Sequence, residues 1–500
     1  MHGFRLFERA AGYGEAVAIH TDGCVTSYSQ LLDDSARVAS ALLESSIDLL
    51  EDRVAFLAPP GPDYVSTQWG VWRAGGVAVP LSLGAAEKEL AYTVSDSGVK
   101  VVVASAAYAE HAQSLCTQAG ARLVPYENTS QSTVRELPKV ERTRRAMILY
   151  TSGTTSKPKG VVTTFDGLEA QIESLVEAWR WQSSDTTPLF LPLHHVHGIV
   201  NVLLCALWSG ACVDAFPRFD AQQILRSVAE GAYSVFMAVP TVYVKLIQVL
   251  QDLSPDERER VVAEFRDMRL MVSGSAALPA SVHNHWRELT GQALLERYGM
   301  TEIGMALSNP YDGERRPGAV GLPLPGVDVR LVAEDGTVAA AEGVQGEIQV
   351  RGRTVFGEYW NRPEATREAF REGWFCTGDI AVREEGYYRI LGRSSVDIIK
   401  SGGYKLSALE IEASLLDHPS IKECAVVGLA DDTWGEVVAA ALVAEDGPDI
   451  DPEEVRAWCQ GVMSAYKVPR RFLITEQLPR NVMGKITKPA VSALFTASEG

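Results

Sequence analysis

Residues 150–160 carry the strongest chemical signal in the sequence. They contain five Ser or Thr hydroxyls, two glycines and two lysines, and they directly follow the apolar residues 147–149. Hydroxyls and free backbone N–H groups can surround phosphate oxygens, and lysine neutralises their charge. The spacing differs from the GxxxxGK[ST] pattern, so we predict a phosphate-binding loop of another kind. A polar turn without a ligand is the structural alternative.

Four further motifs follow in the chain: Arg-Tyr-Gly-Met-Thr-Glu at 297–302, Trp-Phe-Cys-Thr-Gly-Asp at 374–379, Gly-Arg at 392–393 followed by Asp-Ile-Ile-Lys-Ser-Gly-Gly-Tyr-Lys at 397–405, and Pro-Arg-Asn-Val-Met-Gly-Lys-Ile at 479–486. Taken singly, Glu302 could start a helix, Asp379 could belong to a turn, and Lys485 could be a solvated lysine. In this order, however, the five motifs resemble those of the adenylate-forming superfamily, which includes acyl-CoA synthetases, adenylation domains and firefly luciferase. The resemblance covers nearly the whole chain, from about residue 15 to 490.

The resemblance implies an enzyme that joins a carboxylate to AMP, releases pyrophosphate, and then lets a thiol displace AMP. It implies ATP, Mg²⁺ and coenzyme A as ligands, and neither zinc nor flavin. By resemblance, Lys485 bridges the acid and the α-phosphate, Thr301 donates to the α-phosphate, and Glu302 holds Mg²⁺ with Thr151. The implied nucleotide-binding residues are Thr151, Ser152, Gly153, Thr154, Thr155, Lys159, Ser275, Ala276, Ala277, Tyr298, Gly299, Met300, Thr301, Asp379 and Arg393.

The resemblance also divides the chain and assigns it two conformations. It implies a hinge at Ser395, about which a C-terminal domain alternates between the two half-reactions. After the rotation, a coenzyme A channel would form at Lys400, Ser401, Gly402 and Gly403.

Arg297 indicates which acid is used, because it stands directly before the Tyr-Gly of its motif. A guanidinium binds carboxylates bidentately, and beside a fatty acid its buried charge would stay unpaired. We therefore predict a second carboxylate on the substrate, with a structural ion pair between Arg297 and Glu296 or another acid as the alternative. Residues 191–198, 272–279 and 296–308 resemble the malonyl-CoA synthetases. Residues 297–308 and 395–409 especially resemble the mitochondrial branch, which takes malonate and methylmalonate. A ligase for another short-chain carboxylic acid is the alternative function.

The same resemblance adds Ser273 to the acid pocket and places His195 at its mouth as a catalytic residue. His194, His195 and His197 could suggest a zinc site. Catalytic zinc needs a third protein ligand, and neither an HExxH pattern nor a nearby carboxylate accompanies the HxH pair, so we do not expect zinc here.

The charge composition of the chain limits the classes of partner that it can bind. The chain has 500 residues with 46 Lys and Arg against 64 Asp and Glu, a net charge of −18. We therefore expect no nucleic-acid or membrane partner. Residues 467–488 contain six basic residues and only one acidic residue, which suggests a local phosphate-attracting surface. The basic residues are Lys467, Arg470, Arg471, Arg480, Lys485 and Lys488. Seven cysteines without a CxxC pair indicate reduced thiols. The expected location is the cytoplasm, or the mitochondrial matrix for a processed chain. The sequence leaves open whether the molecule is a monomer or a dimer.

Alternating apolar and helical segments in the first 275 residues predict an α/β fold with parallel sheets. Expected strands lie at 54–57, 76–80 and 99–103, and residues 199–216 should form a buried helix followed by a strand. Residues 313–393 predict a small antiparallel β subdomain that completes an N-terminal domain of residues 1–393. Residues 394–500 should form a small mobile α+β domain, with a capping box at 407–410 and a helix at 453–466.

Overall fold

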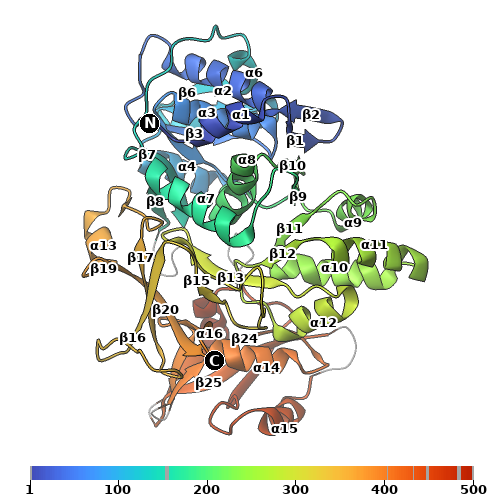
Figure 1. Cartoon of the computed structure of the whole chain (residues 1–500). Coiled ribbons are helices and arrows are strands. Elements are labelled where there is room, and N and C mark those ends of the chain that lie inside the picture. The colour runs from blue at the N-terminus through green and yellow to red at the C-terminus, as the bar shows by residue number, and fades with distance from the viewer. Residues whose placement is uncertain are drawn as a thin grey trace.

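The computed structural model describes residues 3–151, 157–401, 404–431, 433–445, 450–480 and 486–497. Figure 1 shows the N-terminal elements in blue and green above β13, which crosses the middle of the molecule, and the last hundred residues in orange and red below it. Within the described chain, no helix is long and apolar enough to cross a membrane. Lys485, together with Ser152, Gly153, Thr154, Thr155, Gly402 and Gly403, lies outside the described residues.

The first large sheet has the strand order β18-β8-β7-β4-β3-β5-β6. Its strands are β3 (Arg53–Leu57), β4 (Val77–Pro80), β5 (Val101–Ala104), β6 (Arg122–Pro125), β7 (Arg145–Thr151), β8 (Lys159–Thr164) and β18 (Glu358–Tyr359). Strands β4, β3, β5 and β6 pair in parallel, as the sequence predicts. Strands β7 and β8 pair antiparallel, because the short connection between them cannot make a parallel crossover.

Helices separate the strands of this sheet and lie beside it: α2 (Tyr28–Leu43), α3 (Pro62–Arg73), α4 (Glu87–Ser97), α5 (Ala109–Ala119) and α7 (Phe165–Trp179). Short elements complete the N-terminal part: α1 (Leu6–Tyr13), η1 (Ala106–Tyr108) and α6 (Tyr126–Thr129). A second sheet has the order β2-β1-β10-β9, formed by β1 (Val17–Thr21), β2 (Cys24–Ser27), β9 (Thr186–Leu189) and β10 (Cys212–Ala215).

A third sheet has the order β11-β12-β13-β14-β15 and supplies most of the site. Its strands are β11 (Val235–Ala238), β12 (Leu270–Ser273), β13 (Leu295–Met300), β14 (Gly304–Ser308) and β15 (Leu322–Pro323). The first three are parallel, and β14 returns antiparallel to β13. The accompanying helices are α9 (Ala221–Ala229), α10 (Pro240–Asp252), α11 (Pro255–Asp267) and α12 (Ala280–Thr290).

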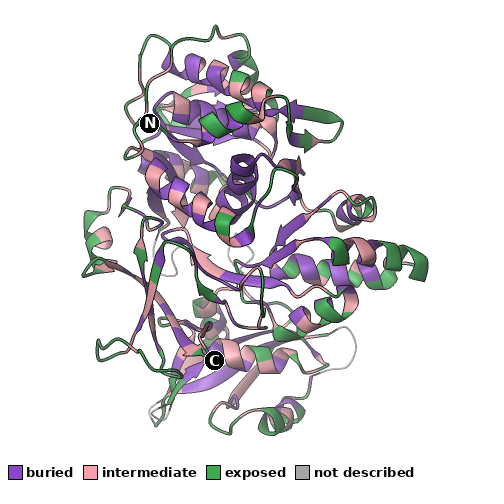
Figure 2. Cartoon of the chain, in the orientation of Figure 1, coloured by how far each residue is buried: buried purple, intermediate pink, exposed green. Residues whose placement is uncertain are grey.

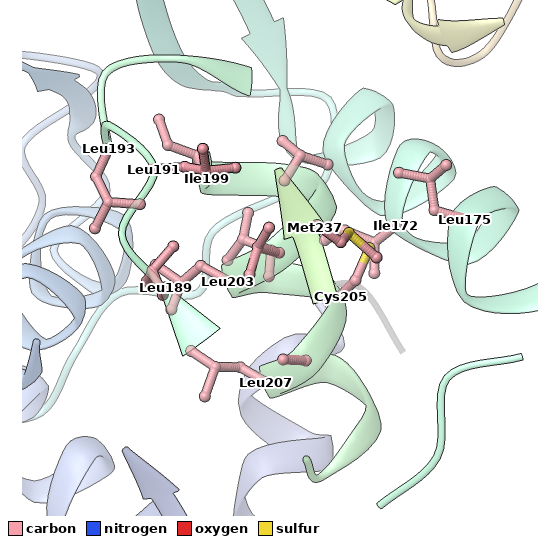
Figure 3. Packing of buried hydrophobic residues seen from close by; sticks show 14 of the residues in the cluster. Ile172, Leu175, Leu189, Leu191, Leu193, Ile199, Leu203, Cys205, Leu207 and Met237 are labelled. Carbon is pink, nitrogen blue, oxygen red and sulfur yellow. The ribbon is translucent and has the colours of Figure 1, made fainter. Parts of the chain in front are cut away.

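The expected buried helix after residue 199 begins as the π-helix η2 (His197–Leu204), continues as α8 (Cys205–Ser209), and is followed by β10. Its apolar side chains pack against neighbours from β9, α7 and β11. Figure 3 shows Leu203, Cys205 and Leu207 among Leu189, Ile172 and Met237. The sequence predicts the helix but not its π form, which is frequent at functional sites.

An antiparallel sheet lies within the range predicted for the β subdomain: β16 (Val327–Val332), β17 (Gly346–Gly352), β20 (Trp374–Glu384), β19 (Phe370–Arg371) and β21 (Tyr387–Arg393), with helix α13 (Pro363–Glu368) beside it. The remaining described elements are β22 (Ile398–Ser401), β23 (Tyr404–Ser407), α14 (Ala408–Leu416), β24 (Ile421–Asp431), β25 (Gly435–Ala444), α15 (Pro452–Val462), β26 (Arg471–Ile474) and α16 (Lys488–Ala497).

The N-terminal and C-terminal parts of the chain have separate hydrophobic cores. Two core clusters consist of buried residues between 4 and 388, and two others consist of buried residues between 399 and 495. In Figure 2 the buried strands of each part lie inside exposed helical faces. The described cysteines are free thiols, as expected, although Cys24 is exposed.

Two local predictions in the C-terminal part need correction. Ser407 caps α14 by accepting from the Glu410 N–H, but Glu410 does not complete the predicted capping box, because its carboxylate binds Arg389 and Lys467 instead. The helix predicted for 453–466 ends at Val462, since Met463 has an extended backbone.

Candidate functional site

Strand β13 places consecutive residues of the site on opposite faces of its sheet, because neighbouring side chains on a strand point in opposite directions. Arg297 lies opposite Ser308 of β14 and Tyr298 lies opposite Leu307. Within β13, Gly299 passes so close to β14 that a Cβ there would lie 2.1 Å from the Gly304 carbonyl oxygen. The predicted Tyr-Gly-Met-Thr-Glu motif therefore turns tightly, and its side chains separate into different environments.

Three of the predicted nucleotide-binding residues meet at one carboxylate. Asp379 accepts the Tyr298 hydroxyl at 2.6 Å and the Arg393 Nε at 2.9 Å. Asp379 and Arg393 are register partners on β20 and β21, so the sheet itself places the pair. Burial alone would lower the pKa of Arg393, but the Asp379 carboxylate raises it above the ordinary value. The corner thus combines a carboxylate acceptor, a fixed cation and an aromatic ring.

Glu302 lies in the turn between β13 and β14 and is only 6% exposed. Its Oε1 accepts the Tyr359 hydroxyl at 2.9 Å, and the Lys159 Nζ lies 4.6 Å from the centre of the Tyr359 ring. Burial raises the pKa of Glu302, and the Tyr359 hydrogen bond partly offsets that increase. No motif identifies Tyr359, because it arrives on β18, which pairs with β8 from a distant part of the chain.

The guanidinium of Arg297 lies in a polar cluster on the other side of β13. Its Nη2 donates to the Ser275 Oγ at 3.4 Å, and the same hydroxyl lies 3.0 Å from the His197 Nδ1. Ser275 adopts a positive φ of 70°, a conformation that costs a non-glycine residue free energy and that clusters at functional sites. The polypeptide thus holds a strained serine against the arginine.

The charge of Arg297 is not neutralised by a carboxylate of the described chain. Arg297 is 5% exposed, and burial lowers its pKa to about 10, so it is protonated at neutral pH. Glu296, the expected alternative partner, points to the opposite face of β13, where its Oε1 accepts the Gly318 N–H at 2.9 Å. Burial raises the pKa of Glu296 to about 8, so this neighbour is largely uncharged at neutral pH.

Several buried polar atoms near this part of the fold have no hydrogen-bond partner among the described residues. They belong to residues of β12, β13 and η2: the Ser273 Oγ, the Arg297 Nε, the His197 Nε2 and both ends of the Asn201 amide. Buried polar groups normally have partners, so such a set marks a place where a polar ligand can bind. Sequence reasoning did not identify His197 and Asn201 as buried polar residues with unpaired atoms, although Asn201 interrupts an otherwise apolar run.

His195 is half-buried, and its ring centre lies 4.0 Å from that of His194. Burial lowers the pKa of His194 to about 4 and that of His197 well below its ordinary value. These two imidazoles are therefore neutral at physiological pH. A place for His195 at the pocket mouth stays a prediction.

The ends of the predicted phosphate-binding loop are fixed, although residues 152–156 lie outside the described chain. Thr151 and Lys159 are register partners on β7 and β8. Helix α4 holds both sides: the Tyr150 hydroxyl donates to Asp96 at 2.9 Å, and the Tyr92 hydroxyl donates to the Pro158 carbonyl at 2.8 Å.

The remaining predicted residues lie in exposed loops or on the C-terminal part. Ala276 and Ala277 continue the exposed segment after Ser275. Ser395 is exposed in the turn between β21 and β22, Ser401 is buried at the end of β22, and Lys400 lies 3.6 Å from the Glu334 carboxylate. No hydrogen bond or ion pair between the described residues joins Lys400 or Ser401 to Asp379, Glu302 or Arg297.

Three of the six basic residues that were predicted to attract phosphate between 467 and 488 form ion pairs within the fold. They are held by carboxylates from other segments: Lys467 by Glu410 at 2.8 Å, Arg480 by Glu423 at 2.6 Å and Lys488 by Asp397 at 3.1 Å. The prediction is therefore wrong for these three, because it counted charges along the sequence while their partners come from the fold.

Comparisons with known proteins agree with this geometry. Residues 6–360 match the AMP-binding enzyme family, and residues 410–485 match the AMP-binding enzyme C-terminal domain. The mitochondrial malonate–CoA ligase ACSF3 of Mus musculus is 43% identical over 97% of this chain and 89% of its own length. A malonate–CoA ligase of Arabidopsis thaliana is 40% identical over 96% and 86%. The crystal structure of ATP-bound MatB from Rhodopseudomonas palustris superposes with a TM-score of 0.90 at 33% identity, and the alignment covers 100% of both chains.

Proposed function

The chain belongs to the AMP-binding enzyme family, and we propose that within this family it is an ATP-dependent malonate–CoA ligase. The observation that carries the acid assignment is the buried, protonated Arg297, which no carboxylate of the described chain neutralises. A buried charge without a partner costs several kcal/mol or more, and a dicarboxylate substrate supplies that partner. The malonate ligases among the relatives support the same choice.

In the first proposed half-reaction, one malonate carboxylate attacks the α-phosphate of ATP, forming malonyl-AMP and releasing pyrophosphate. Arg297 binds the other carboxylate, and Ser273 and Ser275 donate hydroxyls to it. Tyr298 stacks on the adenine, while Asp379 and Arg393 bind the ribose hydroxyls, which their direct contact in the structure supports. Donors aimed at the phosphate, from Thr301, the loop at 151–159 and Lys485, offset the repulsion between the two anions.

The surroundings of Glu302 fit Mg²⁺. The group is a single buried carboxylate, and the described residues contain no cluster of three or more His, Cys, Asp or Glu side chains that could hold a metal ion. Magnesium suits such a site, because it usually keeps waters and substrate phosphates as its other ligands. Glu302, with Thr151, would hold the ion, which supplies positive charge against the phosphates.

In the second proposed half-reaction, the coenzyme A sulfur attacks the malonyl carbonyl and AMP leaves. We propose that residues 394–500 rotate about Ser395 as a separate domain and that Lys400, Ser401, Gly402 and Gly403 then line the pantetheine channel. The separate core clusters on either side of residues 390–399 support this boundary.

The test is coenzyme A-dependent AMP formation with ATP and Mg²⁺, measured for malonate, methylmalonate, succinate, acetate and butyrate. Malonate or methylmalonate should have the highest kcat/KM, and the Lys485→Ala variant should be inactive in the complete reaction. A preference for acetate or butyrate would contradict the malonate assignment and make the chain a ligase for another short-chain acid. Absence of AMP formation with every acid would contradict the ligase assignment itself.

A further inference from the structure

Lys488 begins helix α16 and lies in a nearly closed charged cluster. Its Nζ is 3.1 Å from the Asp397 Oδ1, forms a second ion pair with Glu412, and donates to the Val426 carbonyl at 2.7 Å. The three charged side chains are only 13%, 14% and 15% exposed. Lys488 therefore uses its donors within the protein and is not free to bind a phosphate.

Asp397 connects this cluster to the predicted hinge. While its Oδ1 faces Lys488, its Oδ2 accepts the Arg393 N–H at 3.0 Å, and its own N–H donates to the Arg393 carbonyl at 2.8 Å. Gly392 permits this approach, since a Cβ there would lie 2.4 Å from the Asp397 Cβ. Arg393 in turn binds Asp379, so the connection reaches the predicted nucleotide-binding residues Asp379 and Tyr298.

The described residues on both sides of 481–485 are also fixed. Arg480 and Ile486 form an antiparallel bridge, and the Thr487 N–H donates to the Pro479 carbonyl at 2.9 Å. Lys488 directly follows Thr487 and stands three positions after Lys485 in the sequence. The described chain resumes at Ile486, two residues before Lys488, whose ion pair with Asp397 fixes the position of this end.

We infer that Lys488 is a positioning residue for adenylation, because its ion pairs hold the described chain that directly follows Lys485 against Asp397, next to the hinge. The inference rests on the proposed function. Without the lysine ammonium, the start of α16 would lose the ion pairs that hold it to Asp397 and Glu412, and its position relative to the hinge would no longer be fixed. A displacement of about 1 Å in a reacting group can cost about 10²-fold in rate.

The experiment separates the half-reactions in full-length Lys488→Met. Adenylation is measured as malonate-dependent ATP–pyrophosphate exchange, and thioesterification as coenzyme A consumption of preformed malonyl-AMP. We expect exchange to fall about 10²-fold in kcat with KM for ATP and malonate nearly unchanged, and thioesterification to stay within about threefold of the wild type. Lys467→Met is the matched control, because it also removes a lysine from a carboxylate of α14 and should not separate the half-reactions.

Asp397→Asn provides a second variant, since an amide cannot accept from both Lys488 and the Arg393 N–H. It should show the same loss of exchange with preserved thioesterification, and it decides the matter where Lys488→Met does not fold. Equal loss of both half-reactions, or loss of neither, in a folded variant would overturn the inference. Failure of the wild-type chain to catalyse malonate-dependent exchange would instead contradict the proposed function.

Discussion

The guanidinium of Arg297 lies directly against the backbone of Gly274. A Cβ added at Gly274 would lie 2.4 Å from the Arg297 Cζ and 2.5 Å from its Nε. Gly274 has no positive φ that would demand glycine, so the absence of a side chain serves space rather than backbone freedom. This contact explains how a large charged side chain fits within the core between β12 and β13.

Gly274→Ala should therefore displace the guanidinium without strain in the backbone. Because the obstructing atoms are the end of a flexible side chain, the free energy of unfolding should change by less than about 1 kcal/mol. The KM for malonate should rise at least about tenfold, corresponding to about 1.4 kcal/mol, while the KM for ATP stays the same. Steady-state kinetics of both substrates check this, with Gly12→Ala on α1 as the control. An unchanged KM for malonate would show that the position of the guanidinium does not matter.

Tyr359→Phe should weaken the proposed magnesium site. The Tyr359 hydroxyl lowers the pKa of Glu302, so its loss should raise that pKa further and let protons compete better with Mg²⁺. A hydrogen bond to a charged group contributes about 1.5 kcal/mol, so the Mg²⁺ concentration for half-maximal rate should rise about tenfold.

The difference should grow as the pH is lowered, because more of the carboxyl is then protonated. Titration of Mg²⁺ at several pH values measures it, and Tyr387→Phe, which removes a hydroxyl bonded to the Glu314 carbonyl, is the control. The same Mg²⁺ requirement in Tyr359→Phe and in the wild type would argue against Glu302 as the magnesium ligand.

Glu296→Gln should change how stability depends on pH. Burial raises the pKa of Glu296 from 4.5 to about 8, so between these values the folded protein keeps a proton that the unfolded chain has released. The contribution of this group to the free energy of unfolding is complete below about pH 4.5 and is lost as the pH rises towards about 8. Glutamine removes this slope and can still accept the Gly318 hydrogen bond.

Denaturant unfolding of both proteins between about pH 5 and 8 is the measurement. The free energy of unfolding should fall more steeply with rising pH in the wild type than in Glu296→Gln. Parallel curves would mean that Glu296 is ionised in the folded protein, and it would then have to be reconsidered as a counter-charge for Arg297.

The sequence predicted the residues whose role depends on local order, and it missed those that arrive through tertiary packing. Tyr298, Asp379 and Arg393 stand in recognisable motifs, and the structure brings them together. Tyr359 has no such signal, because an edge strand carries it to Glu302. The same reason explains Lys488, whose charge suggested phosphate binding along the sequence but is neutralised by Asp397 and Glu412 in the fold.

Secondary structure shows the same division. The pattern of apolar residues and the turn residues located strands β3, β4 and β5 within a few positions, because burial and strand pairing impose this apolar pattern on the local sequence. The π-helix at His197 has no distinct sequence period, and the actual partners of Glu410 could not be known before α14 and Arg389 were placed beside each other.

The most direct test of the central claim, that Arg297 binds the second carboxylate of malonate, is the ratio of kcat/KM for malonate to kcat/KM for butyrate in the wild type and in Arg297→Met. The exposed Arg287→Met on α12 is the matched control. Truncating one partner of a buried charge pair costs about 2–5 kcal/mol, so the ratio should fall by at least about 30-fold in Arg297→Met, while butyrate turnover is kept or improved. A ratio that is the same in the wild type, Arg297→Met and Arg287→Met would contradict the account, because Arg297 would then play only a structural role.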